Sequence, residues 1–219
     1  MVKSGNFNVF YLFLFVIILV VSISCTRSNA GHHFKNGNAN YNLKDYVGAI
    51  RDLDMAIELN PQYTEAYYVR ALCNSKLNNY PKALNDFNKV IELDPEFKDA
   101  YINRAYYVKE KTGDYLGAID DCNKFIELNS DNNNSFAYNN RGFAKFMLND
   151  TIGAMDDIQM SLSLNPENSY AFKNRALIYI ALDSISKACE DLNKAELLGY
   201  SKDYDQEAIK LIAEYCQSN

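Results

Sequence analysis

Few side chains in this sequence have the types and the spacing that catalysis requires. The two histidines, His32 and His33, are neighbours, and the acids and cysteines around them form no pattern of metal ligands or of a nucleophile with its base. Paired carboxylates such as Asp120 and Asp121 are adjacent on a predicted helix, where they point about 100° apart and cannot share one site. Glycine-rich phosphate-binding loops are absent. We therefore expect no catalytic residue, metal, cofactor or small-molecule substrate.

The cysteines are spaced too widely for metal or thioredoxin-type chemistry. Apart from Cys25, the chain has Cys73, Cys122, Cys189 and Cys216, and none belongs to a Cys-x-x-Cys pair. Three of them, Cys73, Cys122 and Cys189, fall within predicted helices, where an isolated cysteine usually packs as a small apolar residue. We expect that role for them, with a disulfide as the less favoured alternative if the protein is exported.

The first 25 residues have the layout of an export signal. Lys3 precedes an uncharged apolar run from Phe10 to Val21, and Ser22, Ile23 and Ser24 lead from that run to Cys25. A basic start, an apolar stretch and an end with small residues are typical of a secretory signal.

The same segment resembles a bacterial lipoprotein signal, in which the cysteine is lipidated and becomes the mature N-terminus. The resemblance implies a signal peptide at residues 1–24, a lipid on Cys25 and a linker at residues 25–29. One departure is Ser22, because the family usually has leucine three places before the cysteine. Thr26, instead of aspartate, follows the cysteine, which by analogy favours the outer membrane, with the protein facing the periplasm.

Two alternatives to lipidation remain open. Ordinary signal cleavage is possible because Ser22–Ser24 and Ser28–Ala30 both have the small-x-small pattern, which would give a secreted protein. Residues 7–24 are also long enough to be kept as a transmembrane anchor. All three interpretations place the rest of the chain outside the cytoplasm or beside a membrane.

The remainder of the sequence repeats with a period of 34 to 36 residues. One repeated motif runs from alanine to aspartate, at Ala49–Asp52, Ala83–Asp86, Ala118–Asp121, Ala154–Asp157 and Ala188–Asp191. A second motif is an arginine followed by alanine or glycine, at Arg70, Arg104, Arg141 and Arg175. Prolines close the first, second and fourth units, at Pro61, Pro95 and Pro166. A fixed period in this range determines the architecture of the whole array.

This pattern resembles the tetratricopeptide repeat, a pair of antiparallel helices, over roughly residues 30–200. The resemblance implies an all-α, right-handed superhelical solenoid of five helical hairpins with a C-terminal capping helix. The five units would span residues 30–63, 64–97, 98–134, 135–168 and 169–202, with the cap and tail at residues 203–219.

The repeated columns have physical roles in packing two helices together. Small residues let helices approach closely, and on the first helices these are Gly37, Ala71, Ala105, Gly142 and Ala176. Residues that can accept hydrogen bonds from free N–H groups precede the second helices, and we expect N-caps at Asp45, Asn79, Asp114, Asp150 and Ser184. Pro81 falls in a first turn, where proline is tolerated.

Irregular places are expected in the array. The third unit has one extra residue, which we place in the turn at residues 111–114, and the polar residues 130–135 replace its closing proline with a longer loop. A helix at about residues 204–216 is predicted to cap the last repeat. Its buried face would consist of Ala208, Ile209, Ile212, Ala213 and Cys216.

The arginines and aspartates that recur in units two to five are expected to pair with each other, which is a structural role. The alternative is that the arginines hold a carboxylate ligand. Tetratricopeptide domains that clamp a C-terminal carboxylate use a recurrent set of lysine and asparagine, and this sequence lacks that set. At the clamp positions the first three units have Phe34 and Asn38, Tyr68 and Leu72, and Ile102 and Tyr106.

The resemblance also indicates which side chains line the inner face of the solenoid. They are Tyr68, Leu72, Ile102, Asn103, Tyr106, Asn140, Phe143, Phe146, Tyr170, Asn174 and Leu177. Aromatic rings interleaved with side-chain amides suit a bound peptide, whose backbone needs donors and acceptors and whose side chains need apolar pockets. The alternative is that some of these residues pack against the next repeat.

The charge and the repeats together favour a protein-binding role. The formal net charge of −6 at pH 7 disfavours nucleic acid as a partner. We expect a non-catalytic adaptor that is tethered to an envelope membrane through a lipid anchor and binds a protein or peptide. The alternatives are a structural subunit of an envelope assembly and a regulatory module for a separate enzyme.

Overall fold

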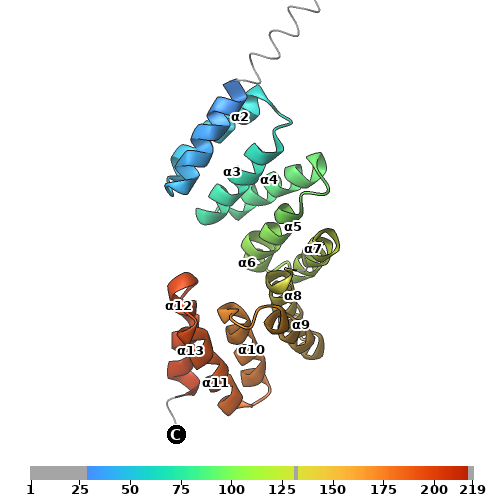
Figure 1. The fold of residues 1–219 in the computed structure, drawn as a ribbon, viewed down its shortest axis with the longest axis vertical. Helices are drawn as coiled ribbons and strands as arrows, with labels where there is room; N and C mark the ends of the chain where they lie inside the picture. Colours follow the sequence, from blue (N-terminus) through green and yellow to red (C-terminus); the bar gives the residue numbers. More distant parts are fainter. Residues whose placement is uncertain (1–28, 131–132, 217–219) are drawn as a thin grey trace, which may run out of the picture. The chain divides into compact units, whose positions relative to one another are not determined.

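The computed structural model describes residues 29–130 and 133–216 and is built there from helices, with no strand among them (Figure 1). The chain forms two compact units, which meet in the sequence between Pro95 and Glu96. The predicted signal peptide, Cys25 and residues 131–132 of the predicted loop lie outside the described residues. No described helix combines the length and the apolar character needed to cross a membrane.

Unit 1 contains two helical hairpins. A helix over residues 29–42 pairs with α2, and α3 pairs with α4. The labelled helices are α2 (Tyr46–Leu59), α3 (Thr64–Lys76) and α4 (Tyr80–Leu93). Leu53, Phe87 and Val90 are fully buried in this unit.

Unit 2 contains three further hairpins and a C-terminal cap. The first helix of its first hairpin is split into α5 (Lys98–Arg104), the π-helix η1 (Ala105–Lys109) and α6 (Glu110–Thr112), and it pairs with α7 (Tyr115–Leu128). The other two pairs are α8 (Ser135–Met147) with α9 (Thr151–Leu164), and α10 (Ser169–Ala181) with α11 (Ile185–Leu197). The cap consists of α12 (Tyr200–Asp203) and α13 (Glu207–Tyr215). The predicted all-α array of five hairpins with a terminal cap is confirmed.

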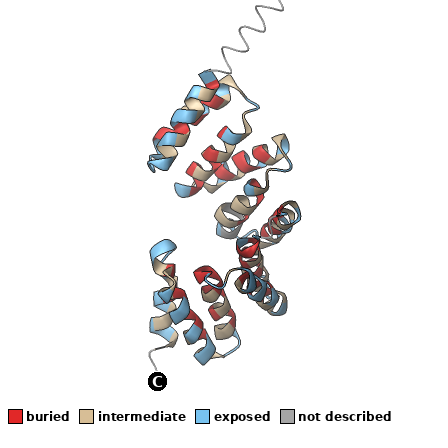
Figure 2. Cartoon of the chain, viewed as in Figure 1, coloured by how far each residue is buried: buried red, intermediate tan, exposed pale blue. Residues whose placement is uncertain are grey.

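The small-residue columns lie where the helices of a hairpin touch. Ala71, Ala105 and Ala176 are fully buried, and Figure 2 shows buried residues along one side of each helix. A Cβ atom added to Gly142 would lie 3.0 Å from the Ile158 side chain and 3.1 Å from the carbonyl oxygen of Ala154. A side chain at this position would therefore crowd Ile158 and the backbone of α9.

Three of the five predicted N-caps are confirmed. In each, the aspartate side chain accepts a hydrogen bond of 2.9 to 3.0 Å from a glycine N–H three residues later. These bonds join Asp45 to Gly48, Asp114 to Gly117 and Asp150 to Gly153. Asn79 and Ser184 occupy the N-cap positions of α4 and α11 as predicted, but neither makes such a side-chain bond, so the predicted hydrogen bond is wrong for those two residues. Pro81 lies in the first turn of α4, as predicted.

The extra residue of the third unit lies within the first helix and not in the turn. It is accommodated by the π-helix η1, whose wider turn takes up one additional residue without breaking the helix. The expected placement at residues 111–114 is therefore wrong. The insertion lies at Tyr106 and Tyr107. The rings of these two residues contact each other edge to face, with their centroids 4.8 Å apart.

The capping helix is held to the last repeat by a disulfide. Cys189 on α11 is bonded to Cys216 at the end of α13, with their Cα atoms 5.7 Å apart. The prediction that Cys189 acts only as an unpaired apolar residue is therefore wrong, because the end of α13 reaches the half-buried side of α11. Cys73 and Cys122 are buried cysteines outside this disulfide, as predicted.

The face of α13 that packs on α11 differs in part from the prediction. Ala208, Ile212 and Cys216 belong to or pack against the core cluster around Leu192. Leu211 takes part as well, whereas Ile209 is 46% exposed and Ala213 is also exposed. The helix begins three residues later than expected, at Glu207, and the stripe that faces the core includes Leu211 in place of Ile209 and Ala213.

Candidate functional site

The predicted inner-face residues divide between the two units. Tyr68 and Leu72 lie on α3 of unit 1, and the other nine lie on the first helices of unit 2. We call the side formed by α5, η1, α8 and α10 the first-helix face of unit 2. The structure brings Tyr106 of η1 and Tyr170 of α10 together on this face, with ring centroids 6.1 Å apart.

Two of the predicted amides are buried between α8 and α10. Asn174 is 2% exposed and donates to Asn139 at 3.0 Å, and Asn139 in turn donates to Asn140 at 3.3 Å. The Oδ1 atom of Asn174 is buried without a hydrogen-bond partner. Asn174 and Asn139 therefore connect the neighbouring first helices α10 and α8, and Asn140 accepts from Asn139 within α8. The half-buried Asn103 donates to the backbone of its own helix, at Asp99.

A cluster of three tyrosine rings stands at the C-terminal end of this face. Tyr170 stacks with Tyr200 and with Tyr204 at centroid distances of 6.0 and 5.1 Å, and the last two are 5.3 Å apart. Tyr200 and Tyr204 come from α12 and the residue after it, so the cap covers part of the first-helix face. The fifth unit ends in Leu198-Gly199-Tyr200, whereas the first, second and fourth units end in proline. This difference is the one sequence signal that could have drawn attention to the two tyrosines.

A buried lysine lies beneath these rings. The Lys173 side chain is 3% exposed, and its Nζ atom is 4.9 Å from the centroid of Tyr170, 5.4 Å from Phe143 and 5.8 Å from Tyr200. The same atom forms a 3.0 Å ion pair with Glu207 of α13. Aromatic faces attract a cation, and a buried cation needs a carboxylate or an equivalent partner. Sequence reasoning missed Lys173 because no other repeat has a lysine at this position.

The buried phenol of Tyr200 makes the cap sensitive to alkaline pH. Burial raises the pKa of Tyr200 above its ordinary value of 10.0, and the nearby Asp205 and Glu207 raise it further. The unfolded chain releases this proton near its ordinary pKa while the folded chain retains it. The free energy of unfolding is therefore expected to fall as the pH rises above that value.

Urea unfolding between about pH 8 and 11 tests this expectation, since unperturbed tyrosines titrate near 10. The variant Tyr200→Phe has no phenol proton at this position and is expected to show a shallower alkaline decline than the wild type. Parallel declines of the two proteins would contradict the assignment.

The recurring arginines and aspartates pair within their own hairpins. The Nε and Nη2 atoms of each arginine donate to the two carboxylate oxygens of one aspartate at 2.5 to 2.9 Å. The pairs are Arg70 with Asp86, Arg104 with Asp121, Arg141 with Asp157 and Arg175 with Asp191. The structural role is therefore confirmed. In the first unit, Asp52 instead accepts from Asn40 at 2.9 Å.

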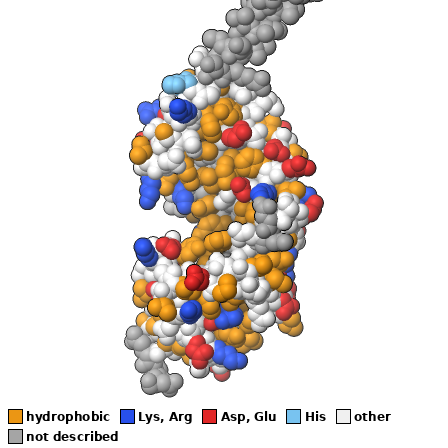
Figure 3. All heavy atoms as spheres, viewed as in Figure 1, with side chains coloured by type: hydrophobic (Ala, Val, Ile, Leu, Met, Phe, Trp, Pro, Cys, Tyr) orange, Lys and Arg blue, Asp and Glu red, His pale blue; other side chains and the backbone are white. Residues whose placement is uncertain are grey.

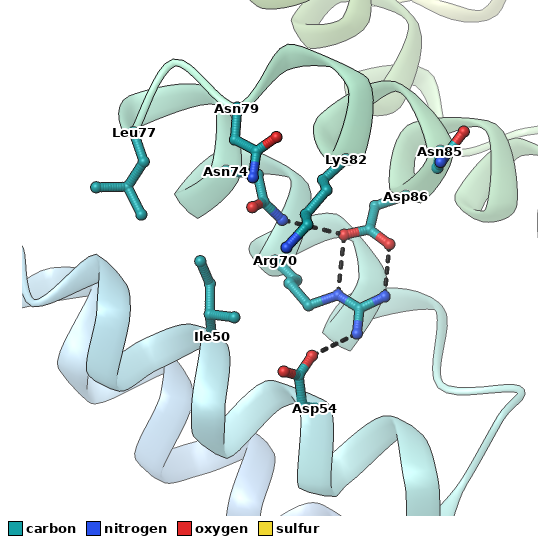
Figure 4. Close-up of a pocket in the computed structure, with 9 residues that line it drawn as sticks. All are labelled: Ile50, Asp54, Arg70, Asn74, Leu77, Asn79, Lys82, Asn85 and Asp86. Carbon is teal, nitrogen blue, oxygen red and sulfur yellow. Dashed lines mark hydrogen bonds and ion pairs between the residues drawn. The ribbon is translucent and has the colours of Figure 1, made fainter.

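A cleft of about 490 Å³ lies beside the first of these pairs, between α2, α3 and α4 (Figure 4). The Arg70 guanidinium lies between Asp86 and Asp54 and donates to both. Burial raises the pKa of Asp86 above its ordinary value, and Arg70 opposes that shift. Both carboxylates of the cleft are paired with Arg70. The three side chains therefore hold the neighbouring helices together, and neither acid is left unpaired for chemistry.

The described residues contain no group of three or more histidine, cysteine or acidic side chains placed to hold a metal ion. On the surface, acidic and basic side chains are interspersed over the face shown in Figure 3, with apolar patches between them. Of the predicted inner-face residues, Leu72 and Leu177 are half-buried, and neither is among the residues packed against the described core clusters.

Comparison with known proteins supports the repeat assignment. Residues 64–97 match the family model of the tetratricopeptide repeat. A similar solved structure is PilW, a widely conserved type IV pilus biogenesis factor, with a TM-score of 0.74 and 16% identity over 85% of this chain and 84% of PilW. A comparison with curated proteins gives no match.

Two further solved structures have the same fold. YrrB, described as a TPR protein with an unusual peptide-binding site, has a TM-score of 0.66 and 20% identity over 87% of this chain and 95% of YrrB. A tetratricopeptide repeat protein from Parabacteroides merdae has a TM-score of 0.64 and 26% identity over 84% of this chain and 71% of that protein. The fold is therefore that of tetratricopeptide solenoids.

Proposed function

We propose that this tetratricopeptide-type solenoid is a non-catalytic adaptor, tethered to a bacterial envelope membrane through a lipid on Cys25. It binds a peptide or a protein through its first helices, which carry the inner-face residues named above. Proteins of this fold serve as interaction modules, because stacked hairpins present long surfaces for a partner.

The half-buried leucines at inner-face positions carry the proposal. Leu72 on α3 and Leu177 on α10 are both half-buried at these positions. Phe143 on α8 is half-buried as well, and its ring lies near Tyr115 and Lys173. When a partner buries apolar side chains that the fold leaves partly exposed, the burial contributes favourably to the free energy of binding.

Two observations support export. The sequence begins with a basic residue and an apolar run that leads to Cys25, which is the layout of a lipoprotein signal. The disulfide between Cys189 and Cys216 is independent of that segment, and disulfides persist in oxidising compartments outside the cytoplasm. YrrB, with its peptide-binding site, and PilW, a pilus biogenesis factor, are structural neighbours consistent with an adaptor role.

Affinity capture from native membranes tests the adaptor role. The double variant Leu72→Glu, Leu177→Glu is expected to capture at least tenfold less partner than the wild type, because each glutamate would lose its water at the contact. Quantitative mass spectrometry of the captured material gives the measurement, and circular dichroism verifies that the variant remains folded.

The matched control carries the same change on second helices. Met55 on α2 and Met160 on α9 are 40% and 45% exposed, so Met55→Glu with Met160→Glu alters charge equally on the opposite side of the hairpins. The control is expected to retain the partner. If the control loses the partner and the first-helix variant does not, the protein is instead a structural subunit that assembles through its second helices.

A further inference from the structure

The charged side chains of unit 1 differ in sign between its two edges (Figure 1). We call residues 42–47 and 76–82, which contain the turns inside the two hairpins, the turn edge. Residues 58–65 and 89–95, which contain the loops that follow the hairpins, form the loop edge. On the turn edge, Asp45 is outnumbered by Lys44, Lys76 and Lys82. On the loop edge, Lys89 is outnumbered by Glu58, Glu65, Glu92 and Asp94.

Both edges have exposed charges with no ion-pair partner among the described residues. On the turn edge these are Lys44 and Lys82, and on the loop edge they are Glu58 and Glu65. The acid of the turn edge is engaged, because the Asp45 side chain accepts from a backbone N–H of α2. Each edge therefore presents two uncompensated charges, positive on the turn edge and negative on the loop edge.

Apolar side chains accompany the lysines of the turn edge. Leu43 is 78% exposed, Val47 is 68% exposed and Leu77 is 44% exposed. Leu77 and Lys82 also line the cleft between α2, α3 and α4, and Figure 4 shows the Lys82 side chain directed toward that cleft. Exposed apolar side chains gathered in one place and bordered by polar groups are typical of an interaction surface.

The backbone at Lys44 is unfavourable for a long side chain. Its φ angle is 63°, in the left-handed region, in the turn after the helix over residues 29–42. At this position the other hairpins have asparagine, glycine or aspartate, which adopt the conformation more readily, at Asn78, Gly113, Asn149 and Asp183. Lysine costs stability here and forms no ion pair in the described chain, so the conformation points to a role for its charge outside the fold.

We propose that the turn edge of unit 1 binds the loop edge of unit 1 in a second copy of this chain. Lys44 and Lys82 of one copy face Glu58 and Glu65 of the next copy. The three exposed apolar side chains of the turn edge are buried at the same contact. This self-association is separate from the binding of a partner on the first helices.

The loop edge offers a surface for those apolar side chains. Pro61 is exposed there, and a cleft of about 330 Å³ is lined by its neighbours, which are Gly31, Asn60, Gln62, Tyr63 and Glu65. Exposed ion pairs contribute little free energy by themselves, whereas the burial of apolar area is favourable. The apolar side chains therefore supply most of the attraction, and the charges select which two edges meet.

The contact joins two different surfaces, so it is head-to-tail. The two edges lie at opposite ends of the same hairpins, and each copy in a pair keeps one edge unoccupied. Further copies can therefore add in a row or close into a ring. The proposed lipid on Cys25 would concentrate the copies at one membrane, which favours weak contacts of this kind.

An anionic membrane is the other partner that a basic, apolar edge could meet. Gly31 lies at the cleft of the loop edge, so the chain enters unit 1 from that edge. A tether at Cys25 would hold the loop edge near the bilayer. The turn edge lies at the other end of α2, whose 14 residues span about 20 Å. This geometry favours a second copy over lipid as the partner of the turn edge.

Sedimentation velocity of the full chain in detergent solution tests the proposal with two complementary variants. The turn-edge variant carries Lys44→Glu and Lys82→Glu, and the loop-edge variant carries Glu58→Lys and Glu65→Lys. Each variant alone has like charges on both edges, and the dissociation constant of its self-association is expected to rise by about tenfold or more. An equimolar mixture has opposite charges at every contact between the two variants and is expected to associate as the wild type does.

The design separates the contact from overall charge. The two variants change the net charge in opposite directions, so a loss of association in both cannot come from repulsion between whole molecules. The control variant, Lys35→Glu with Arg51→Glu, makes the same net change as the turn-edge variant. It changes exposed residues in the middle of the first helix and of α2, and it is expected to associate as the wild type does.

Carbodiimide cross-linking provides a second measurement in native membranes. The reagent joins a lysine directly to a carboxylate that it contacts. In membranes with a mixture of ¹⁴N- and ¹⁵N-labelled copies, mass spectrometry is expected to find turn-edge lysines joined to loop-edge glutamates of the other isotope. The turn-edge variant is expected to lose these mixed-isotope products.

Three results would overturn the proposal. The first is a wild type that stays monomeric in solution and gives no mixed-isotope product in membranes. The second is a mixture of the two variants that associates no better than either variant alone. The third is a monomeric wild type that binds phosphatidylglycerol vesicles more strongly than the turn-edge variant, which would assign this edge to the membrane. The adaptor proposal is tested separately, because Leu72 and Leu177 lie on neither edge.

Discussion

Replacing Cys189 and Cys216 together with serine is expected to lower the free energy of unfolding of unit 2 by about 3 to 4 kcal/mol. The disulfide closes a loop with a sequence separation of 27 residues, and opening it restores the corresponding chain entropy to the unfolded state. The loss should concentrate in the cap, because each element of a repeat array contacts only its neighbours.

Chemical unfolding with and without dithiothreitol measures this loss. The wild type is expected to become as unstable as the serine variant when reduced, and the serine variant is expected not to respond. Hydrogen exchange should accelerate most in α13 and α11.

Cys73 and Cys122 provide the control for reduction. Burial raises the pKa of the Cys73 thiol to about 12, so this thiol stays protonated and unreactive at neutral pH. A protein with alanine at both positions keeps only the disulfide cysteines of the folded part and should respond to dithiothreitol as the wild type does. Four titratable thiols in the unreduced, denatured wild-type fold would contradict the disulfide.

Replacing Cys25 with serine is expected to move the protein from the membrane fraction to the soluble fraction. Serine cannot form the thioether that carries the lipid, and the acyl chains are what hold such a protein at a bilayer. Fractionation followed by immunoblotting gives the distribution, and mass spectrometry of the wild-type N-terminus tests whether Cys25 carries acyl chains.

The neighbouring substitution Thr26→Ser is the matched control and should leave the protein at the membrane. Retention of the Cys25→Ser variant in the membrane would point to residues 7–24 as a transmembrane anchor. An unmodified wild-type N-terminus beginning at Gly31 would show ordinary signal cleavage and a secreted protein.

The fold could be predicted because its signals are periodic. Ala71, Ala105 and Ala176 lie at the same position in different repeats. Each one indicates the same close approach of two helices, so one irregular unit does not hide the pattern. The pairing of arginine with aspartate could be predicted for the same reason, since both residues recur in register. Asp45, Asp114 and Asp150 were predicted as caps from residue type and position alone.

The features that the sequence did not reveal are those that occur once. An inserted residue looks the same in the sequence whether it lengthens a turn or is absorbed as a π-helix, and only the observed π-helix at Ala105–Lys109 distinguishes the two. The disulfide joins Cys189 to a residue in the cap, whose position relative to α11 has no counterpart in the other repeats. Lys173 and Tyr204 were missed because no other repeat has a lysine at the position of Lys173, and the segment that carries Tyr204 follows the last repeat.

The separation of 16 or 17 residues between each arginine and its aspartate has a consequence for how such a chain can evolve. Both charges lie within one hairpin, so duplication or deletion of a whole hairpin carries the cation and its counter-ion together. The array can therefore change its length without leaving a buried charge that has no counter-ion. In the first hairpin Asn36 stands where the later hairpins have arginine, and Asp52 accepts from Asn40, the counterpart of Asn74, which donates to Asp86 in the next hairpin.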